Sequence, residues 1–189
     1  MPSPSPLPPA DEQRPPPTAG ARSDLDAASI FAVLNSHRVD YVVVGGYAAQ
    51  MRGASRPTTD ADVTPETSAE NLARLATALR ALKARIRTDA VPEGLPFDTS
   101  ADALRGMKTL NLQTEHGDLD LAFVPDGTTG YGDLIRSATA QPVGGTVAQV
   151  AALSDIIRSK TAAGRQKDIE ALPELHALAR HGQPPAAGV

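Results

Sequence analysis

Two aspartates separated by one small residue, Asp60 and Asp62, are the side chains of this sequence best suited to chemistry. Alternate residues of a β-strand point to the same face, so the two carboxylates would project together. Two carboxylates at such a short distance repel one another unless a cation lies between them. Hard oxygen ligands of this kind suit Mg²⁺. The pair therefore predicts a divalent-metal site; the alternative is an acidic turn on a solvated surface.

A glycine pair, Gly45 and Gly46, precedes these aspartates and follows the apolar run Tyr41–Val44. Glycine lets a phosphate approach the backbone, and the N-terminus of a following helix offers unpaired N–H groups to an anion. A phosphate cradle followed by a metal-binding carboxylate pair indicates chemistry on a nucleotide.

A third acidic ligand is expected from residues 117–121, where Asp118 and Asp120 alternate with leucines. Asp120 would lie on the strand face opposite Leu119 and Leu121. When a hydroxyl attacks a phosphate beside a metal ion, it must be deprotonated or positioned, and a third carboxylate can do this. We predict Asp120 for this role. Asp118 shares its face and is the alternative, either as the ligand or as a partner of the ligand.

Positive charge gathers in residues 158–167, which include Lys160, Arg165 and Lys167. Ammonium and guanidinium groups can hold the phosphates of a nucleotide and balance their negative charge. Lys160 is the first candidate for this contact. The alternative is an ordinary pair of charged helices with solvated side chains.

Together these segments resemble the nucleotidyltransferase (polymerase-β-like) superfamily, in which a helix begins at Gly-Gly and an Asp-x-Asp strand follows. The spacing from Gly46 to Asp60 fits that pattern. Over residues 41–172 the chain looks most similar to the AbiE-type toxin nucleotidyltransferases, including the MenT group. Those enzymes place an Arg and a Thr just before the aspartates, where Arg56 and Thr59 stand here.

The resemblance implies an enzyme that moves a nucleoside monophosphate from an NTP to a hydroxyl. It implies two Mg²⁺ ions, with Mn²⁺ as the alternative, held by Asp60, Asp62 and Asp120. The nucleotide would be bound by Gly45, Gly46, Arg56, Thr59, Lys160 and Arg165. Asp168 would belong to the active-site set and orient Lys160 or a neighbouring arginine.

By the same resemblance the acceptor is the 3′ end of tRNA, and the chain is the toxin of a toxin–antitoxin system with a cognate antitoxin. The alternatives are a small-molecule (antibiotic) or protein acceptor, and a non-catalytic binding module with this fold. A tRNA enzyme needs a basic surface that extends from the cleft, and the basic residues between Arg74 and Arg87 favour RNA weakly.

Hydrophobic periodicity predicts the elements that must position these side chains. Strands are expected at 41–44, 59–63, 85–88, 107–113, 119–124 and 145–148, with a turn at His116-Gly117. Helices are expected from Ser23 to 35–38, at 46–52, from the cap Ser68 through Leu82, at 131–138, from the cap Ser154 to 163, and at 165–181. This order predicts an α+β fold, the nucleotidyltransferase fold by resemblance: a mixed β-sheet flanked by helices with a helical C-terminal portion.

Composition limits the function classes and the domain organisation. The 189 residues suit a Pro-rich disordered tail at 1–22, a catalytic core at 23–150 and a helical part at 151–182 that completes the active site. The absence of cysteine excludes disulfides and thiolate ligands. A net charge of -4 argues against indiscriminate nucleic-acid binding. We expect a cytoplasmic protein, because no apolar run reaches membrane-spanning length.

Overall fold

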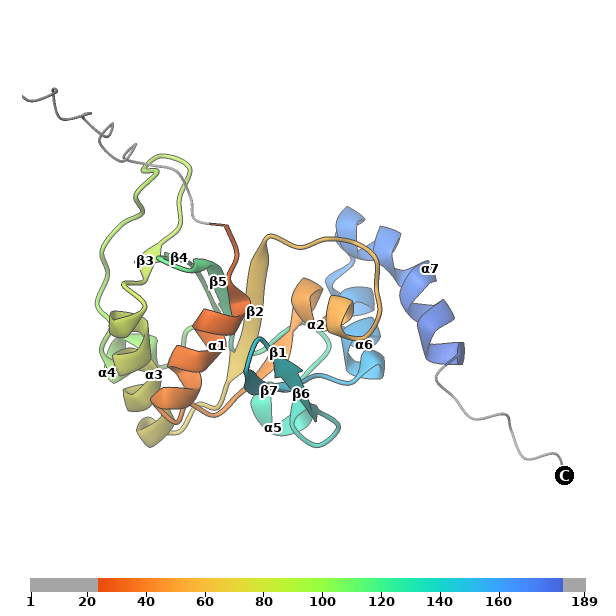
Figure 1. The fold of residues 1–189 in the computed structure, drawn as a ribbon, viewed down its shortest axis with the longest axis horizontal. Coiled ribbons are helices and arrows are strands. Elements are labelled where there is room, and N and C mark those ends of the chain that lie inside the picture. The colour runs from red at the N-terminus through yellow and green to blue at the C-terminus, as the bar shows by residue number, and fades with distance from the viewer. Residues whose placement is uncertain (1–23, 182–189) are drawn as a thin grey trace, which may run out of the picture.

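A mixed seven-stranded sheet, of strand order β3-β4-β5-β2-β1-β7-β6, forms the centre of the chain in a computed structural model that describes residues 24–181 (Figure 1). The predicted tail at 1–22 lies outside the described residues. The strands are Tyr41–Val44 (β1), Asp60–Pro65 (β2), Arg85–Ile86 (β3), Thr109–Thr114 (β4), Gly117–Ala122 (β5), Thr139–Val143 (β6) and Thr146–Val150 (β7). The helices are Ala27–Ser36 (α1), Gly45–Met51 (α2), Ala69–Ala81 (α3), Ala101–Leu104 (α4), Tyr131–Leu134 (α5), Leu153–Ala163 (α6) and Gln166–His181 (α7). The predicted α+β architecture is confirmed.

The pairing of β2 with β5 brings the two acidic segments of the sequence together. These strands are parallel, with Asp60 opposite Asp118 and Asp62 opposite Asp120. On the other side β2 is antiparallel to β1, and β4 and β5 form the predicted hairpin, whose turn is at residues 115–116. All four aspartates therefore lie on one face of two adjacent strands.

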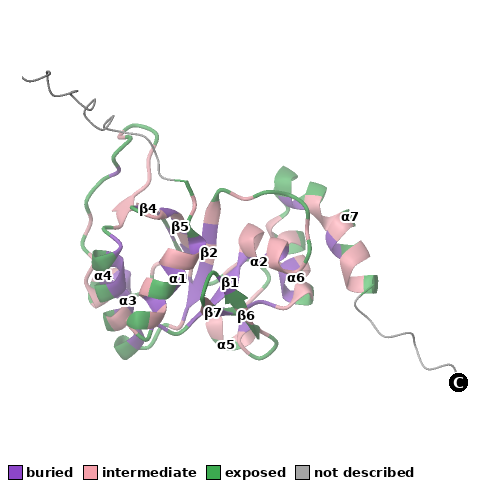
Figure 2. Cartoon of the chain, viewed as in Figure 1, coloured by how far each residue is buried: buried purple, intermediate pink, exposed green. Residues whose placement is uncertain are grey.

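The opposite face of these strands packs into an aliphatic core, and Figure 2 shows β2 as largely buried. The residues that alternate with the aspartates are at most 1% exposed: Ala61, Val63, Leu119 and Leu121. Phe31 of α1 stacks on Tyr41 and meets the edge of Tyr47, so the few aromatic rings gather where α1, β1 and α2 join. Burial of one strand face thus presents the acidic face to the cleft.

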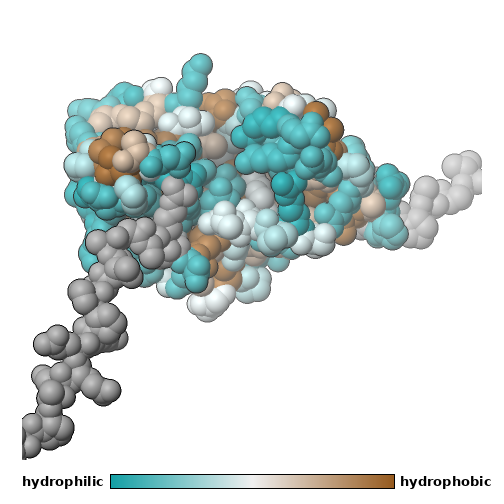
Figure 3. Space-filling model, turned by 90° about the horizontal axis from the view of Figure 1, so that it is seen from above, coloured by the Kyte–Doolittle hydropathy of each residue, from teal (hydrophilic) through white to brown (hydrophobic). Residues whose placement is uncertain are grey.

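The C-terminal helices stand at one end of the molecule, where α6 packs on α7 and on α2 (Figure 1). α1, α3 and α4 lie toward the other end. The surface in Figure 3 is mainly hydrophilic, and the large hydrophobic side chains that stay exposed come from separate segments: Leu95, Val124, Val147 and Ile169. None of the helices within residues 24–181 combines the length and the apolar character of a membrane span.

Of the three helix starts predicted at serine, Ser68 is confirmed as the cap of α3, and the other two are wrong in position. The first described helix is capped by Asp26, whose Oδ1 accepts from the Ser29 N–H at 3.1 Å, while Ser23 lies outside the described residues. α6 begins at Leu153 after Ala152, and no side chain caps it. The Ala151 N–H still donates to Val43 O of β1, so the chain remains attached to the sheet up to this residue. It therefore turns at Ala152, directly before α6.

Two elements were missed by the sequence analysis. β6 contains Pro142, and a proline argues against a strand in the sequence because it lacks an N–H. An edge strand such as β6 tolerates proline, because one side of the strand has no partner strand to pair with. α4 has only four residues, too few to show helical periodicity; Ser100 caps it. In addition, α5 stops at Leu134, so the helix expected at 131–138 is shorter.

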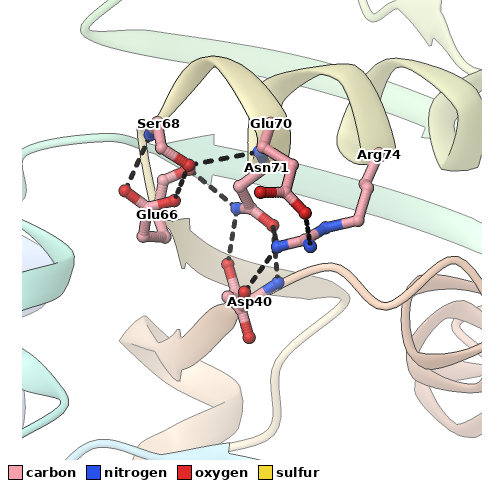
Figure 4. A network of polar contacts seen from close by, with 6 residues as sticks. All are labelled: Asp40, Glu66, Ser68, Glu70, Asn71 and Arg74. Atoms are coloured by element: carbon pink, nitrogen blue, oxygen red, sulfur yellow. Dashed lines mark hydrogen bonds and ion pairs between the residues drawn. The ribbon is translucent and has the colours of Figure 1, made fainter.

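A polar network joins the start of β1 to the end of β2 and to α3 (Figure 4). Its centre is the fully buried Asn71, whose Nδ2 donates to the carbonyls of Asp40 and Glu66 at 2.9 and 2.8 Å. Its Oδ1 accepts from the Asp40 N–H at 2.8 Å and from Arg74 at 3.1 Å. Every polar atom of this side chain therefore has a partner.

Replacement of Asn71 by alanine should lower the free energy of unfolding by about 2–4 kcal/mol, since the part-buried Asp40 N–H and Glu66 carbonyl would lose their side-chain partner. Urea unfolding measures this effect, with Thr77→Ala as the control, because the exposed Thr77 bonds only within α3. A loss below about 0.5 kcal/mol, as for ordinary surface substitutions, would contradict the prediction.

Candidate active site

Three carboxylates converge on the acidic face that β2 and β5 share. Asp60, Asp62 and Asp120 each offer an oxygen atom, and these atoms lie within 4.8 Å of one another. Burial, followed by the charges of Asp60 and Asp120, raises the pKa of Asp62 to about 7. Unrelieved repulsion among oxygen donors is what a hard divalent cation removes. The donor set therefore fits Mg²⁺ or Mn²⁺.

The glycine pair allows this crowding, because Asp62 lies directly against it. Gly45 has φ of +63°, and a Cβ built on it would lie 2.1 Å from Asp62 Oδ2. The Gly46 N–H donates to the same Oδ2 at 3.2 Å. A side chain at position 45 would thus displace the carboxylate of Asp62. It would also place a non-glycine residue in a strained, left-handed backbone conformation.

The loop between α2 and β2 forms the wall that the resemblance associates with the nucleotide. Thr59 is exposed and lines a cleft here. Its neighbour Thr58, which the sequence analysis overlooked, donates to Asp60 Oδ1 at 2.7 Å. Arg56 is half-exposed and reaches α7, with Nη1 3.3 Å from Lys167 O and 3.4 Å from Glu170 Oε2.

The basic segment meets the carboxylates from the C-terminal helices. Asp168 is fully buried and binds Lys160 Nζ at 2.9 Å and Arg165 Nε at 2.6 Å. Burial alone would raise the pKa of Asp168, but the bonds from Lys160 and Arg165 outweigh it and hold the pKa below its ordinary value. Asp168 thus contacts both cations that it was expected to orient.

Two cavities, of about 310 and 190 Å³, flank the carboxylates. Both are lined by Gly45, Asp62, Asp120, Lys160, Arg165 and Asp168. The larger cleft adds the cations Arg56 and Lys167. The smaller cavity adds Asp126, Asp155 and a largely aliphatic wall that includes Leu121 and Ile156. One side of the site is therefore suited to polyanions, and the other is acidic and apolar.

Arg87, which follows β3, is a site residue that the sequence analysis did not single out. It pairs with both Asp118 and Asp120. No sequence spacing marks Arg87, because it reaches the site only through the order β3-β4-β5 in the sheet. Asp120, and not Asp118, belongs to the group of three carboxylates.

Basic residues between Arg74 and Arg87 bind local partners instead of forming an open surface. Arg74 pairs with Asp40 and Glu70, and Lys83 pairs with Glu115 at 2.7 Å. Arg80 and Arg85 donate to backbone carbonyls of the 93–99 segment. These contacts weaken the prediction that the basic residues between Arg74 and Arg87 form a surface that binds an RNA acceptor.

Comparison with solved structures identifies the fold. The lincosamide antibiotic adenylyltransferase LnuA, in its lincomycin-bound crystal structure, superposes with a TM-score of 0.53. The two are 12% identical, over 82% of this chain and 99% of LnuA. The antibiotic-resistance factor ANT(2″)-Ia gives a TM-score of 0.48 and 14% identity, over 82% of this chain and 88% of that one. Neither a protein-family model nor a curated protein sequence matches the chain. The chain has the nucleotidyltransferase fold.

Proposed function

We propose that this chain is a metal-dependent nucleotidyltransferase that moves a nucleoside monophosphate from an NTP to a hydroxyl and releases pyrophosphate. The observation that carries the proposal is the meeting of Asp60, Asp62 and Asp120 between a cation-lined cleft and an acidic, apolar cavity. A binding module without chemistry would not need three mutually repelling carboxylates, since they weaken the fold.

The chain's own residues divide the work of transfer. Mg²⁺ held by the three aspartates would supply Lewis-acid stabilisation of the charge on the reacting phosphate. Lys160 and Arg165, oriented by Asp168, hold the phosphates that leave, with Lys167 and Arg56 along the same cleft. Asp120 positions the acceptor hydroxyl and accepts its proton as the new bond to phosphorus forms.

The smaller cavity favours a small hydroxylated molecule as the acceptor. It adjoins Asp120 and has aliphatic walls, with Asp126 and the Arg158-paired Asp155 as further acidic groups beside Lys160 and Arg165. The aliphatic walls and the small volume suit a compact, partly apolar acceptor. LnuA, which shares the fold, is a lincosamide adenylyltransferase.

The tRNA 3′ end, the toxin role and a cognate antitoxin stay predictions that rest on the resemblance to AbiE-type enzymes. An RNA acceptor needs an accessible basic surface beside the cleft. The pairing of Arg74, Lys83 and Arg87 with acidic neighbours weighs against the surface expected for it.

One experiment tests both the reaction and the acceptor. The full-length chain is incubated with Mg²⁺ and each α-³²P-labelled NTP in turn, with total tRNA or with lincomycin, the ligand of LnuA, as the acceptor. Label on a small molecule supports the first acceptor and label on tRNA the second. Absence of transfer and of NTP binding in every arm would refute the proposed function.

Lys160→Met should lower kcat/KM for the NTP about ten- to hundred-fold, because a charge-assisted hydrogen bond contributes about 1.5–3 kcal/mol. Lys160→Arg should recover part of this loss, since a guanidinium replaces a compact ammonium imperfectly. Lys83→Met is the matched control, as its ammonium is exposed and pairs with Glu115 on the surface. Steady-state kinetics with varied NTP provide the measurement. Unchanged kcat/KM in folded Lys160→Met would assign the phosphate contact to Arg165 or Lys167.

A further inference from the structure

Arg87 binds two of the four carboxylates on the acidic face of β2 and β5. Its Nη1 lies 2.6 Å from Asp118 Oδ2, and its Nη2 lies 2.7 and 2.9 Å from the two oxygens of Asp120. The exposed fractions of the three side chains are 18%, 13% and 19%. Water screens such pairs little, so these contacts are strong.

The contact with Asp120 conflicts with the use of that residue as a metal ligand. Asp120 directs both oxygens to Arg87, and one of these oxygens would also have to face Asp60 and Asp62. A divalent ion among the three carboxylates would be repelled by the adjacent guanidinium. Either the arginine shares Asp120 with the ion or it withdraws.

Asp118 provides a second attachment for Arg87 that does not involve the metal ligands. Asp118 Oδ2 receives Nη1, so the guanidinium can lose Asp120 and still be paired. The backbone of Arg87 is fixed as well, since its N–H donates to Asn111 O at 2.9 Å. The guanidinium can thus keep its contact with Asp118 while its contact with Asp120 is broken.

We propose that Arg87 is a positioning residue that holds Asp120 in the metal-free chain and yields it to the divalent ion while staying anchored on Asp118. The inference rests on the proposed function, because it takes Asp60, Asp62 and Asp120 as the metal ligands. Arg87 balances the acidic face before the ion arrives, and this exchange lowers the affinity for the ion. Asp118 is then the anchor of the arginine and not the third ligand.

Mn²⁺ affinity, measured by calorimetry on the full-length chain without nucleotide, tests this proposal. Arg87→Gln should bind Mn²⁺ at least about tenfold more tightly than the unsubstituted chain, because a competing cation is gone. The same variant should melt at a lower temperature without metal, since the four carboxylates lose a counter-charge. A purely structural role would lower the melting temperature without tightening the metal site.

Two further variants make the result specific. Arg105→Gln removes the same charge from an exposed pair with Asp102 and should leave Mn²⁺ affinity unchanged. Arg87→Lys, which cannot bridge two carboxylates as a guanidinium does, should bind Mn²⁺ more tightly than the unsubstituted chain but less tightly than Arg87→Gln. If Arg87→Gln does not fold, Arg87→Lys alone decides the outcome.

Unchanged or weaker Mn²⁺ binding by the folded Arg87 variants would overturn the inference. A different result would refute the proposed function. In that case the unsubstituted chain binds no Mn²⁺, or the Asp60→Asn variant binds Mn²⁺ as tightly as the unsubstituted chain. A third outcome is tight Mn²⁺ binding that Asp60→Asn abolishes and that the Arg87 substitutions leave unchanged. This outcome would refute only the role of the arginine.

Discussion

Asp62→Asn should abolish nucleotidyl transfer while making the metal-free chain more stable. Loss of a metal ligand removes several kcal/mol of transition-state stabilisation, so the rate should fall at least about a thousand-fold. The gain in stability comes from the same carboxylate, which is buried and lies beside the charges of Asp60 and Asp120 when no metal ion is bound. Opposite changes in activity and stability are typical of a residue that is retained for function.

The stability gain should depend on pH with a definite sign. The pKa of Asp62 rises from its ordinary value of 3.8 to about 7 on folding, so the folded chain binds this proton more tightly than the unfolded chain. The contribution of the group to stability is therefore most favourable below about pH 4 and declines as pH rises toward 7. At pH 8 the metal-free parent chain has lost this contribution, and Asp62→Asn should be more stable by a few kcal/mol.

Thermal melting at pH 5 and pH 8, with chelator present, measures this difference. The advantage of Asp62→Asn should be large at pH 8 and small at pH 5. Asp102→Asn is the control for net charge, because its side chain is exposed on α4. If Asp62→Asn retains transfer at saturating Mg²⁺, the metal assignment is wrong. If its melting advantage does not change with pH, the raised pKa is wrong.

Asp168→Ala should cause the largest loss of stability among the site variants, about 3–5 kcal/mol. Lys160, only 16% exposed, would be left without its counter-charge in a buried position. Transfer should fall as well, because Lys160 and Arg165 would no longer be held in position. Urea unfolding and transfer assays on the folded fraction give the two measurements.

The double variant Lys160→Met with Asp168→Leu separates the two effects of Asp168. Removal of both charges should restore most of the stability lost in Asp168→Ala, since buried ion pairs are often replaceable by apolar groups. Activity should stay low, because the phosphate contact of Lys160 is gone. A double variant that regains both stability and transfer would show that the pair is structural.

The acidic residues of the site could be predicted because the information is local. Asp60 and Asp62 alternate with buried neighbours, and Asp120 stands between two leucines, so strand periodicity alone turns them to one side. The glycine pair, likewise, reveals a turn that has no room for a side chain.

The parts that sequence analysis missed depend on which strands become neighbours. Arg87 reaches Asp118 and Asp120 only because β4 lies between β3 and β5, and no spacing along the chain shows that order. Thr58 was passed over for Thr59 because a loop has no periodicity that would say which hydroxyl faces Asp60. β6 was hidden by Pro142, whose cost depends on the edge position of the strand.

The parallel pairing of β2 with β5 restricts how this chain can be altered. A strand that gains or loses one residue turns every later side chain to the opposite face. In β2 such a change between Asp60 and Asp62 would bury one carboxylate among leucines and send an aliphatic group into the cleft. Single substitutions can therefore adjust the site gradually, whereas a one-residue insertion or deletion inverts it. Length variation among functional homologues should be confined to the loops that flank these strands.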